Sequence, residues 1–134
     1  MANILLIEDE SAIRRVLGKI LTEENKDYVV TEAVDGLEGI ELIRDNDYDL
    51  VLCDIKMPKM DGVEVLEAMK KIKPEIPVVM ISGHGDLDTA VNTMRLGASD
   101  YISKPPDLNR LLNTVRNALD KKSLVVENNR LKKK

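Results

Sequence analysis

Short runs of apolar residues alternate along this chain with stretches in which apolar residues recur every three or four positions. Short segments of this kind without helical spacing are typical of strands. They lie at residues 4–7, 50–53 and 77–81, and two more strand-like segments, which also contain polar residues, lie at 28–33 and 100–102. Helical spacing follows each run, with apolar residues that span 13–21, 37–43, 63–72, 90–96 and 108–119. The pattern therefore predicts five strands that alternate with five helices.

Strands that alternate with helices are typical of an α/β fold, here a doubly wound, five-stranded parallel sheet. Right-handed crossovers bring the carboxyl ends of all strands to one edge of such a sheet. The flavodoxin-like strand order 2-1-3-4-5 places the first strand next to the third. At 134 residues, the chain has the length of one ordinary domain. Groups that follow the first and third strands are therefore expected to meet.

The composition narrows the class of protein. Apolar residues make up 43% of the chain and charged residues 33%, and this balance favours neither a disordered protein nor a membrane protein. Strand-like residues begin at once without a leader, so we expect a cytoplasmic domain. The net charge is −4 with no basic patch in the body of the chain, which argues against direct binding of nucleic acid by this segment. The single cysteine, Cys53, lies within an apolar run and is expected in the core.

Acidic residues follow the two strands that should be neighbours. Glu8 and Asp9 come directly after the first run, and Asp54 ends the third. Carboxylates held close together repel one another, and a hard divalent cation would explain their presence. Since clusters of His or Cys are missing, the oxygen ligands favour Mg²⁺. Acids near the start of a helix can also serve the helix dipole, and that reading remains open for this acidic turn.

The remaining strands deliver a hydroxyl and an ammonium group to the same edge. Ser82 follows the fourth run and Lys104 follows the fifth. Phosphoryl transfer needs a nucleophile and positive charge on the phosphoryl oxygens. The sequence thus predicts Asp54 as the nucleophile that forms an acyl phosphate, with Ser82 and Lys104 as donors to the phosphoryl oxygens.

The order of these groups, together with the pattern Asp54-x-x-Met57-Pro58-x-x-Asp61-Gly62, resembles receiver domains of two-component response regulators over residues 1 to about 121. The resemblance implies that Glu8 and Asp9 bind the metal, that Asp54 is the phosphoacceptor, and that Ser82 is the switch hydroxyl. It makes Lys104 the lysine that contacts the phosphoryl group.

Further positions follow from the same resemblance. Lys56 matches the residue whose backbone carbonyl is offered to the metal, and Tyr101 matches the aromatic residue that moves inward on activation. Lys104-Pro105 resembles the cis peptide of the family. Pro106 departs from the pattern, because many members carry Phe there, and the packing beneath this loop is left open. We expect His84, in a Gly-His-Gly loop, to be an exposed loop residue.

Apolar residues continue past Leu119, with Leu124, Asn128 and Leu131 spaced as in one heptad of a coiled coil. We therefore expect an extended last helix in which residues 122–134 form a helical linker. We also expect a homodimer that forms through this helix and linker. The alternative is a monomer with a frayed helical tail. This helix and the loop at 81–91 resemble receivers of nitrogen-regulatory (NtrC-like) activators of sigma-54 polymerase. In that subfamily an ATPase domain and a DNA-binding domain follow, and both would be missing here.

The sequence as a whole predicts a response regulator receiver domain, which takes a phosphoryl group from a histidine kinase with Mg²⁺ and switches its conformation and dimer assembly. It would not be a conventional enzyme, although it would catalyse its own phosphorylation. A receiver-like dimerisation module independent of phosphate is an alternative. A haloacid-dehalogenase phosphatase would need a second Asp where Lys56 stands. A flavodoxin-type FMN carrier would need a phosphate site where Glu8 and Asp9 repel phosphate.

Overall fold

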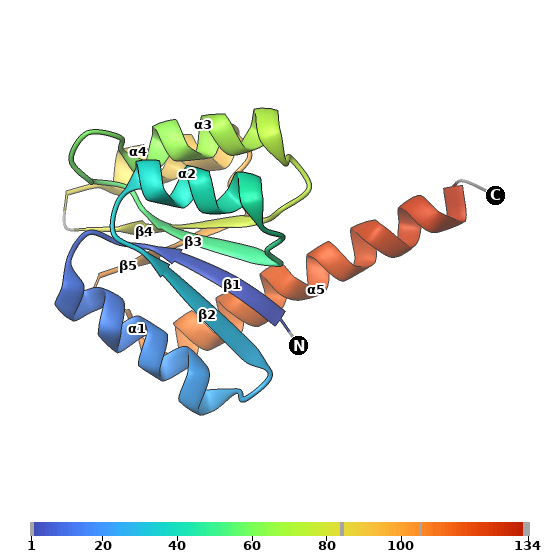
Figure 1. The fold of residues 1–134 in the computed structure, drawn as a ribbon, viewed down its shortest axis with the longest axis horizontal. Coiled ribbons are helices and arrows are strands. Elements are labelled where there is room, and N and C mark those ends of the chain that lie inside the picture. Colours follow the sequence, from blue (N-terminus) through green and yellow to red (C-terminus); the bar gives the residue numbers. More distant parts are fainter. Residues whose placement is uncertain (1, 84, 105, 133–134) are drawn as a thin grey trace.

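The computed structural model describes residues 2–83, 85–104 and 106–132, with side chains described through residue 120. Strands and helices alternate along the whole chain (Figure 1). Their bounds are β1 Ala2–Ile7, α1 Ser11–Glu24, β2 Tyr28–Ala33, α2 Gly36–Asp45, β3 Leu50–Asp54, α3 Gly62–Ile72, β4 Val78–Ser82, α4 Leu87–Arg95, β5 Asp100–Ser103 and α5 Leu108–Lys132.

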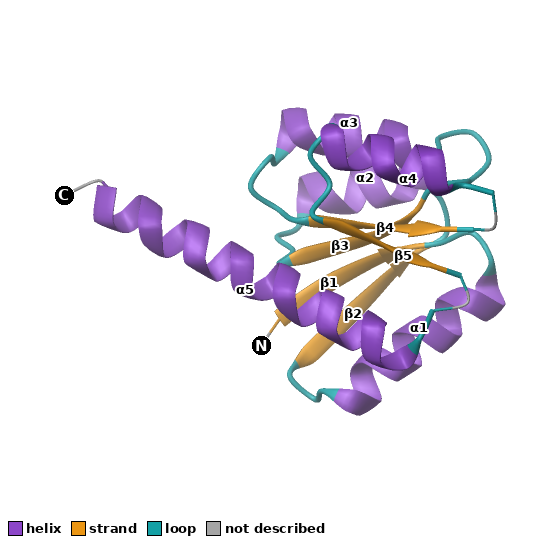
Figure 2. Cartoon of the chain, turned by 180° about the vertical axis from the view of Figure 1, so that it is seen from behind, coloured by secondary structure: helices purple, strands orange, loops and turns teal. Residues whose placement is uncertain are grey.

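The strands form one parallel sheet in the order β2-β1-β3-β4-β5. Helices α1 and α5 cover one face, and α2, α3 and α4 cover the other (Figures 1 and 2). The predicted fold class and strand order are confirmed. Pro77, expected within the fourth strand, precedes it, because proline lacks the N–H that a central strand donates to its neighbour.

The side chains of the central strands are buried on both faces of the sheet, as the uninterrupted apolar runs predict. Alternate residues of β1 point to opposite sides. Ile4 and Leu6 pack with side chains of α1 and α5, whereas Leu5 and Ile7 pack with side chains of α2 and α3. Two hydrophobic cores therefore hold the sheet and fix where each strand ends.

Aspartate side chains cap three helices. Asp35 accepts a hydrogen bond from Glu38 N of α2 at 2.8 Å, Asp107 accepts one from Arg110 N of α5 at 3.0 Å, and Asp61 forms a reciprocal capping box with Glu64 of α3. Asp86 occupies the N-cap position of α4, but its side chain makes no capping bond. The Asp86 carboxylate instead contacts Gly83 N and Lys56 Nζ.

The last helix continues well past the part that packs on the sheet. Residues Leu111, Val115 and Ala118 of α5 are buried, and the helix then projects away from the body to Lys132 (Figure 1). The predicted extension of this helix is confirmed. The expected seam of Leu124, Asn128 and Leu131 lies outside the described side chains. Within the part of the chain that the structure describes, no helix combines the length and apolar character needed to cross a membrane.

Candidate functional site

Three carboxylates meet at the carboxyl edge of the sheet. Glu8 directly follows β1, Asp54 ends β3, and the pairing of Ile7 with Cys53 sets the two strand ends side by side. Oxygen atoms of Glu8, Asp9 and Asp54 all lie within 4.8 Å of one another. Glu8 and Asp54 are buried. The structure therefore brings together the acids that the sequence singled out.

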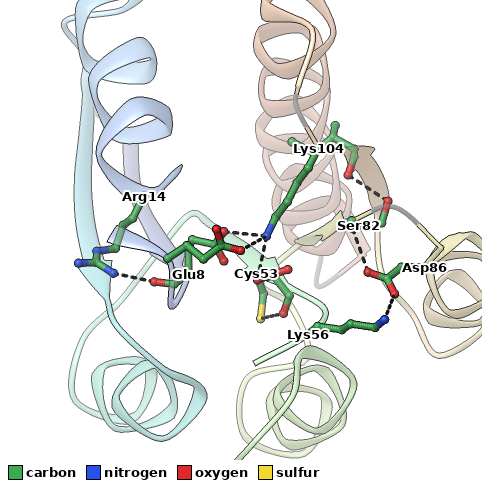
Figure 3. A network of polar contacts seen from close by, with 11 residues as sticks. Glu8, Arg14, Cys53, Lys56, Ser82, Asp86 and Lys104 are labelled. Atoms are coloured by element: carbon green, nitrogen blue, oxygen red, sulfur yellow. Dashed lines mark hydrogen bonds and ion pairs between the residues drawn. The ribbon is translucent and has the colours of Figure 1, made fainter. Parts of the chain in front are cut away.

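An ammonium group lies among these acids (Figure 3). The Nζ atom of Lys104 is 3.0 Å from Asp54 Oδ2, 2.8 Å from Glu8 Oε1 and 3.9 Å from Glu10 Oε1. The backbone N–H of Lys104 donates to the Ser82 carbonyl at 2.8 Å, which continues the pairing of β4 with β5 beyond the strand. The sheet itself thus positions Lys104 against Asp54.

The end of β1 is held from the side of α1. Arg14 Nη1 donates to the Glu8 carbonyl at 2.8 Å, while Arg14 Nε lies 3.2 Å from Glu32 Oε1 of β2. Because this guanidinium is fixed between two strands, the backbone that carries Glu8 has little freedom. Arg14 is a contributor that sequence reasoning missed, since only the fold shows that its helix faces this strand end.

The site shifts the pKa values of Glu8 and Lys104. Burial raises the pKa of Glu8 to about 8, and the neighbouring Asp54 carboxylate adds to the rise, although Lys104 opposes it. Burial alone would lower the pKa of Lys104, but its contacts with Glu8 and Asp54 outweigh that cost and raise it above the ordinary value. The Lys104 ammonium and the carboxyl groups of Glu8 and Asp54 therefore influence one another's protonation at the carboxyl edge of the sheet.

The carboxylates fit a hard cation. Among the described residues, Glu8 Oε2 and Asp9 Oδ1 are buried without a hydrogen-bond partner, while Glu8 Oε1 forms an ion pair with Lys104 Nζ at 2.8 Å. Buried carboxylate oxygens without partners cost free energy. All donors of the cluster are oxygen atoms, which suit a divalent cation such as Mg²⁺ better than a soft metal.

The two expected switch residues lie on neighbouring strands. Ser82 is buried at the end of β4, and its hydroxyl donates to the Ile102 carbonyl of β5 at 3.3 Å. Tyr101, on β5, is half-buried and packs against the core beneath α2, α3 and α4. The Ser82 hydroxyl thus has a partner on β5 that it would have to leave before it could serve a group on Asp54.

An ion pair that sequence reasoning missed joins two loops of the site (Figure 3). Lys56 Nζ lies 2.8 Å from Asp86 Oδ1, and Asp86 Oδ2 accepts a hydrogen bond from Gly83 N at 3.0 Å. The hydrogen bond from Lys56 lowers the pKa of Asp86 below its ordinary value. No sequence signal indicates this pair, because its members are far apart in the chain and Asp86 resembles an ordinary helix cap.

The cluster opens into a cavity of about 680 Å³. Asp54, Lys56, Asp86 and Lys104 line its polar side. Its apolar wall consists of Ala12, Ile13, Val16 and Leu17 of α1 together with Pro106. The side chain at Pro106, where the sequence departs from the family pattern, therefore belongs to the rim of the site. Two expectations, for His84 and for a cis Lys104-Pro105 peptide, lie outside the described residues.

Comparison with known proteins defines the family. Residues 4–116 match the model of the response regulator receiver domain, and the chain belongs to this family. A receiver domain from Clostridium thermocellum has a TM-score of 0.88 and 36% identity, covering 93% of this chain and 99% of that one. The predicted receiver domain is thereby confirmed over the phosphatase and flavodoxin alternatives.

Longer relatives are regulators that contain this domain. Transcriptional regulatory protein ZraR of Klebsiella oxytoca is 38% identical over 87% of this chain and 26% of its own length. An NtrX-like response regulator of Rickettsia bellii is 35% identical over 100% of this chain and 28% of its own length. The structure of NtrX from Brucella abortus in complex with ADP has a TM-score of 0.91 and 39% identity, over 97% of this chain and 30% of that one. The chain thus spans about a quarter of the curated relatives.

Proposed function

We propose that this domain accepts a phosphoryl group on Asp54 and switches conformation in response. The observation that carries the proposal is the position of Asp54: it is buried at the end of β3, receives a hydrogen bond from Lys104 at 3.0 Å, and lines an open cavity. A carboxylate so placed can act as a nucleophile toward a phosphorus atom that enters the cavity.

The reaction follows from the groups present. A carboxylate oxygen of Asp54 attacks the phosphorus of a phosphohistidine, a P–O bond forms, and the P–N bond breaks in line with it. The imidazole, protonated on its other nitrogen, leaves as a neutral ring. Lys104 stays close to the new acyl phosphate and offsets its charge. Later attack of water on phosphorus regenerates the Asp54 carboxylate and releases inorganic phosphate.

Glu8, Asp9 and Asp54 would hold a Mg²⁺ ion, and we extend this role to the Lys56 carbonyl from the family resemblance. The buried Glu8 Oε2 and Asp9 Oδ1 atoms, which have no hydrogen-bond partner, support the assignment. When bound, the ion supplies positive charge to the phosphoryl oxygens. The chain's own contribution is to hold the acids in place through the sheet and the Arg14 contact.

The switch would run from Asp54 to β4 and β5. A phosphoryl group adds acceptor oxygens to the cavity, so the Ser82 hydroxyl can exchange its bond with the Ile102 carbonyl for one with phosphate. Lys104 would follow the same group, and the half-buried Tyr101 ring would move inward as Ser82 turns. These contacts exist in only one state, and they shift the population toward that state.

The partner that supplies the phosphoryl group would be a histidine kinase. The cavity at Asp54 has an apolar wall on α1, where the Val16 side chain remains 54% exposed. An exposed apolar surface beside a phosphoryl acceptor suits a helix that carries phosphohistidine. The kinase would therefore dock against α1 and the loop at Pro106.

Residues 1–121 would form the receiver and 122–134 a helical linker toward an effector domain. The projecting part of α5 and the greater length of the relatives support this division. Structures of NtrX from Brucella abortus contain ADP or ATP, which favours an ATPase as the controlled domain. The full-length protein would be a cytoplasmic, sigma-54-dependent transcription activator that also has a DNA-binding domain. Dimerisation would occur through the extended helix.

The test is the molecular mass in solution, measured by light scattering with Mg²⁺ alone and with Mg²⁺ plus beryllofluoride, a mimic of the phosphoryl group. We expect beryllofluoride to change the assembly of the wild-type chain and to leave Asp54→Asn unaffected. A response that persists in Asp54→Asn would contradict the assignment of the acceptor. If the wild-type chain is a dimer that does not bind beryllofluoride and keeps the same mass in its presence, a dimerisation module independent of phosphate would be favoured.

A further inference from the structure

Helix α4 is the most weakly anchored of the first four helices. It buries two residues, Ala90 and Thr93, whereas α1, α2 and α3 each bury three or four. Large apolar side chains on or beside α4 are exposed instead, namely Leu87, Val91, Met94 and Leu96. Elements with few buried contacts open and move at low free-energy cost. The position of α4 therefore depends on what holds its ends.

The residue at the start of α4 has the side chain of a helix cap but not the conformation of one. Asp35 and Asp61, which cap α2 and α3, have ψ values of 175° and 174°. Asp86 has ψ of 12°, and its carboxylate turns back to Gly83 N and to Lys56 Nζ. The Asp86 carboxylate therefore ties the start of α4 to the loop after β3 instead of capping the helix.

The Lys56–Asp86 pair spans the two loops that would close around a phosphoryl group. Lys56 lies two residues after Asp54, and Asp86 lies four residues after Ser82. The Asp86 side chain is 4% exposed and the Lys56 side chain 74%, so the acid is fixed in the protein while the lysine approaches from solvent. The lysine is thus the member that can change partner.

We infer that the Lys56–Asp86 ion pair is a latch that holds the start of α4 in the unphosphorylated state and opens when a phosphoryl group occupies Asp54. This inference rests on the proposed function. Lys56, Asp86 and Asp54 line the same cavity. A phosphoryl group there would attract the Lys56 ammonium and repel the Asp86 carboxylate, and both effects weaken the pair. The start of α4 is then no longer tied to the loop after β3 and is free to move.

Hydrogen exchange of the α4 amides tests the latch, with Mg²⁺ alone and with Mg²⁺ plus beryllofluoride. In Mg²⁺ alone, Lys56→Met and Asp86→Asn should each accelerate exchange in α4 by about threefold to tenfold, as expected for an ion pair with one exposed member. The double variant should exchange no faster than the faster single variant, because both changes break one contact. Beryllofluoride should accelerate exchange in the wild type and add little in the variants.

Two matched controls carry the same changes of charge nearby. Lys59→Met alters an exposed lysine of the same loop, and Asp88→Asn alters an exposed acid in the first turn of α4. Both should exchange at the wild-type rate. Because the Lys56 side chain is largely exposed, Lys56→Met is expected to fold even if Asp86→Asn does not. In that case the exchange rates of Lys56→Met alone decide whether the ion pair holds α4.

Unchanged α4 exchange in Lys56→Met, or additive effects in the double variant, would overturn the latch. Equal acceleration in the Lys59 control would overturn it as well, because the effect would then be one of general charge. A wild-type protein that binds no beryllofluoride would overturn the proposed function and the opening step. The exchange rates in Mg²⁺ alone would still decide separately whether the pair holds α4 in the resting state.

Discussion

Glu8 is expected to release a proton when Mg²⁺ binds. Its side chain is fully buried, and its pKa is raised to about 8 from an ordinary value of 4.5. A group with a pKa of about 8 is roughly nine-tenths protonated at pH 7. Since a metal ion needs the ionised carboxylate, binding at pH 7 should release about 0.9 proton per ion, and the apparent affinity should fall about tenfold for each pH unit below 8.

Titration calorimetry in two buffers of different ionisation enthalpy measures this proton release. Glu8→Gln keeps the size of the side chain but cannot ionise, so it should bind Mg²⁺ more weakly and release no proton. Wild-type protein that binds Mg²⁺ at pH 7 without proton release would contradict the raised pKa of Glu8. Glu8 would then already be ionised through its contact with Lys104.

The same pKa shift predicts how stability changes with pH in the absence of metal. Glu8 binds its proton more tightly in the folded chain than in the unfolded chain, so its contribution is complete below about pH 4.5 and is lost as the pH rises through about 8. The difference between pKa values of about 8 and 4.5 corresponds to a contribution on the order of 5 kcal/mol. Urea unfolding at pH 5 and pH 8 should show a loss in the wild type that Glu8→Gln lacks.

Three further predictions follow from packing and hydrogen bonds. Gly62→Ala would place a Cβ 2.8 Å from Ile55 Cα and closer still to the Asp54 carbonyl, and thermal melting should show a loss of stability of about 1–3 kcal/mol. The control Gly18→Ala, whose Cβ would lie 3.9 Å from its nearest neighbour, should lose no stability. Equal stability of the two variants would show that the Gly62 site is not crowded. Ser82→Ala should lose about 1 kcal/mol and the NMR shift of the Tyr101 ring on addition of beryllofluoride, whereas a wild-type shift would exclude Ser82 as the switch. A chain ended at residue 121 should fold and bind beryllofluoride as a monomer by light scattering, and a persistent dimer would move the interface to the body of the domain.

The central strands could be predicted from the sequence because burial on both faces leaves a direct signal. Leu50 to Cys53 are apolar without alternation and are fully buried. The acids after β1 and β3 could be predicted to meet, because the strand order determines which strand ends are neighbours. This much of the site depends on topology alone.

Features that depend on side-chain direction could not be predicted in the same way. Val91 and Met94 have helical spacing, yet both are exposed, because α4 turns mainly Ala90 and Thr93 toward the sheet. Asp86 is a residue type that often caps helices, but its carboxylate contacts Lys56 instead of its own helix. Only the tertiary fold, which brings the two loops together, determines which contact it makes. In contrast, the capping box of Asp61 and Glu64 is a local feature, because it joins two residues three positions apart in the chain.

Phosphorylation of Asp54 can be tested directly. The most direct measurement is incubation of the chain with Mg²⁺ and a small phosphodonor such as acetyl phosphate, followed by borohydride reduction, which converts an aspartyl phosphate to homoserine, and by peptide mass spectrometry. We expect one modified residue, at Asp54, and none in Asp54→Asn when that variant is folded. Modification at another residue, or none in the wild type at a Mg²⁺ concentration that saturates the site, would show that Asp54 is not the phosphoacceptor.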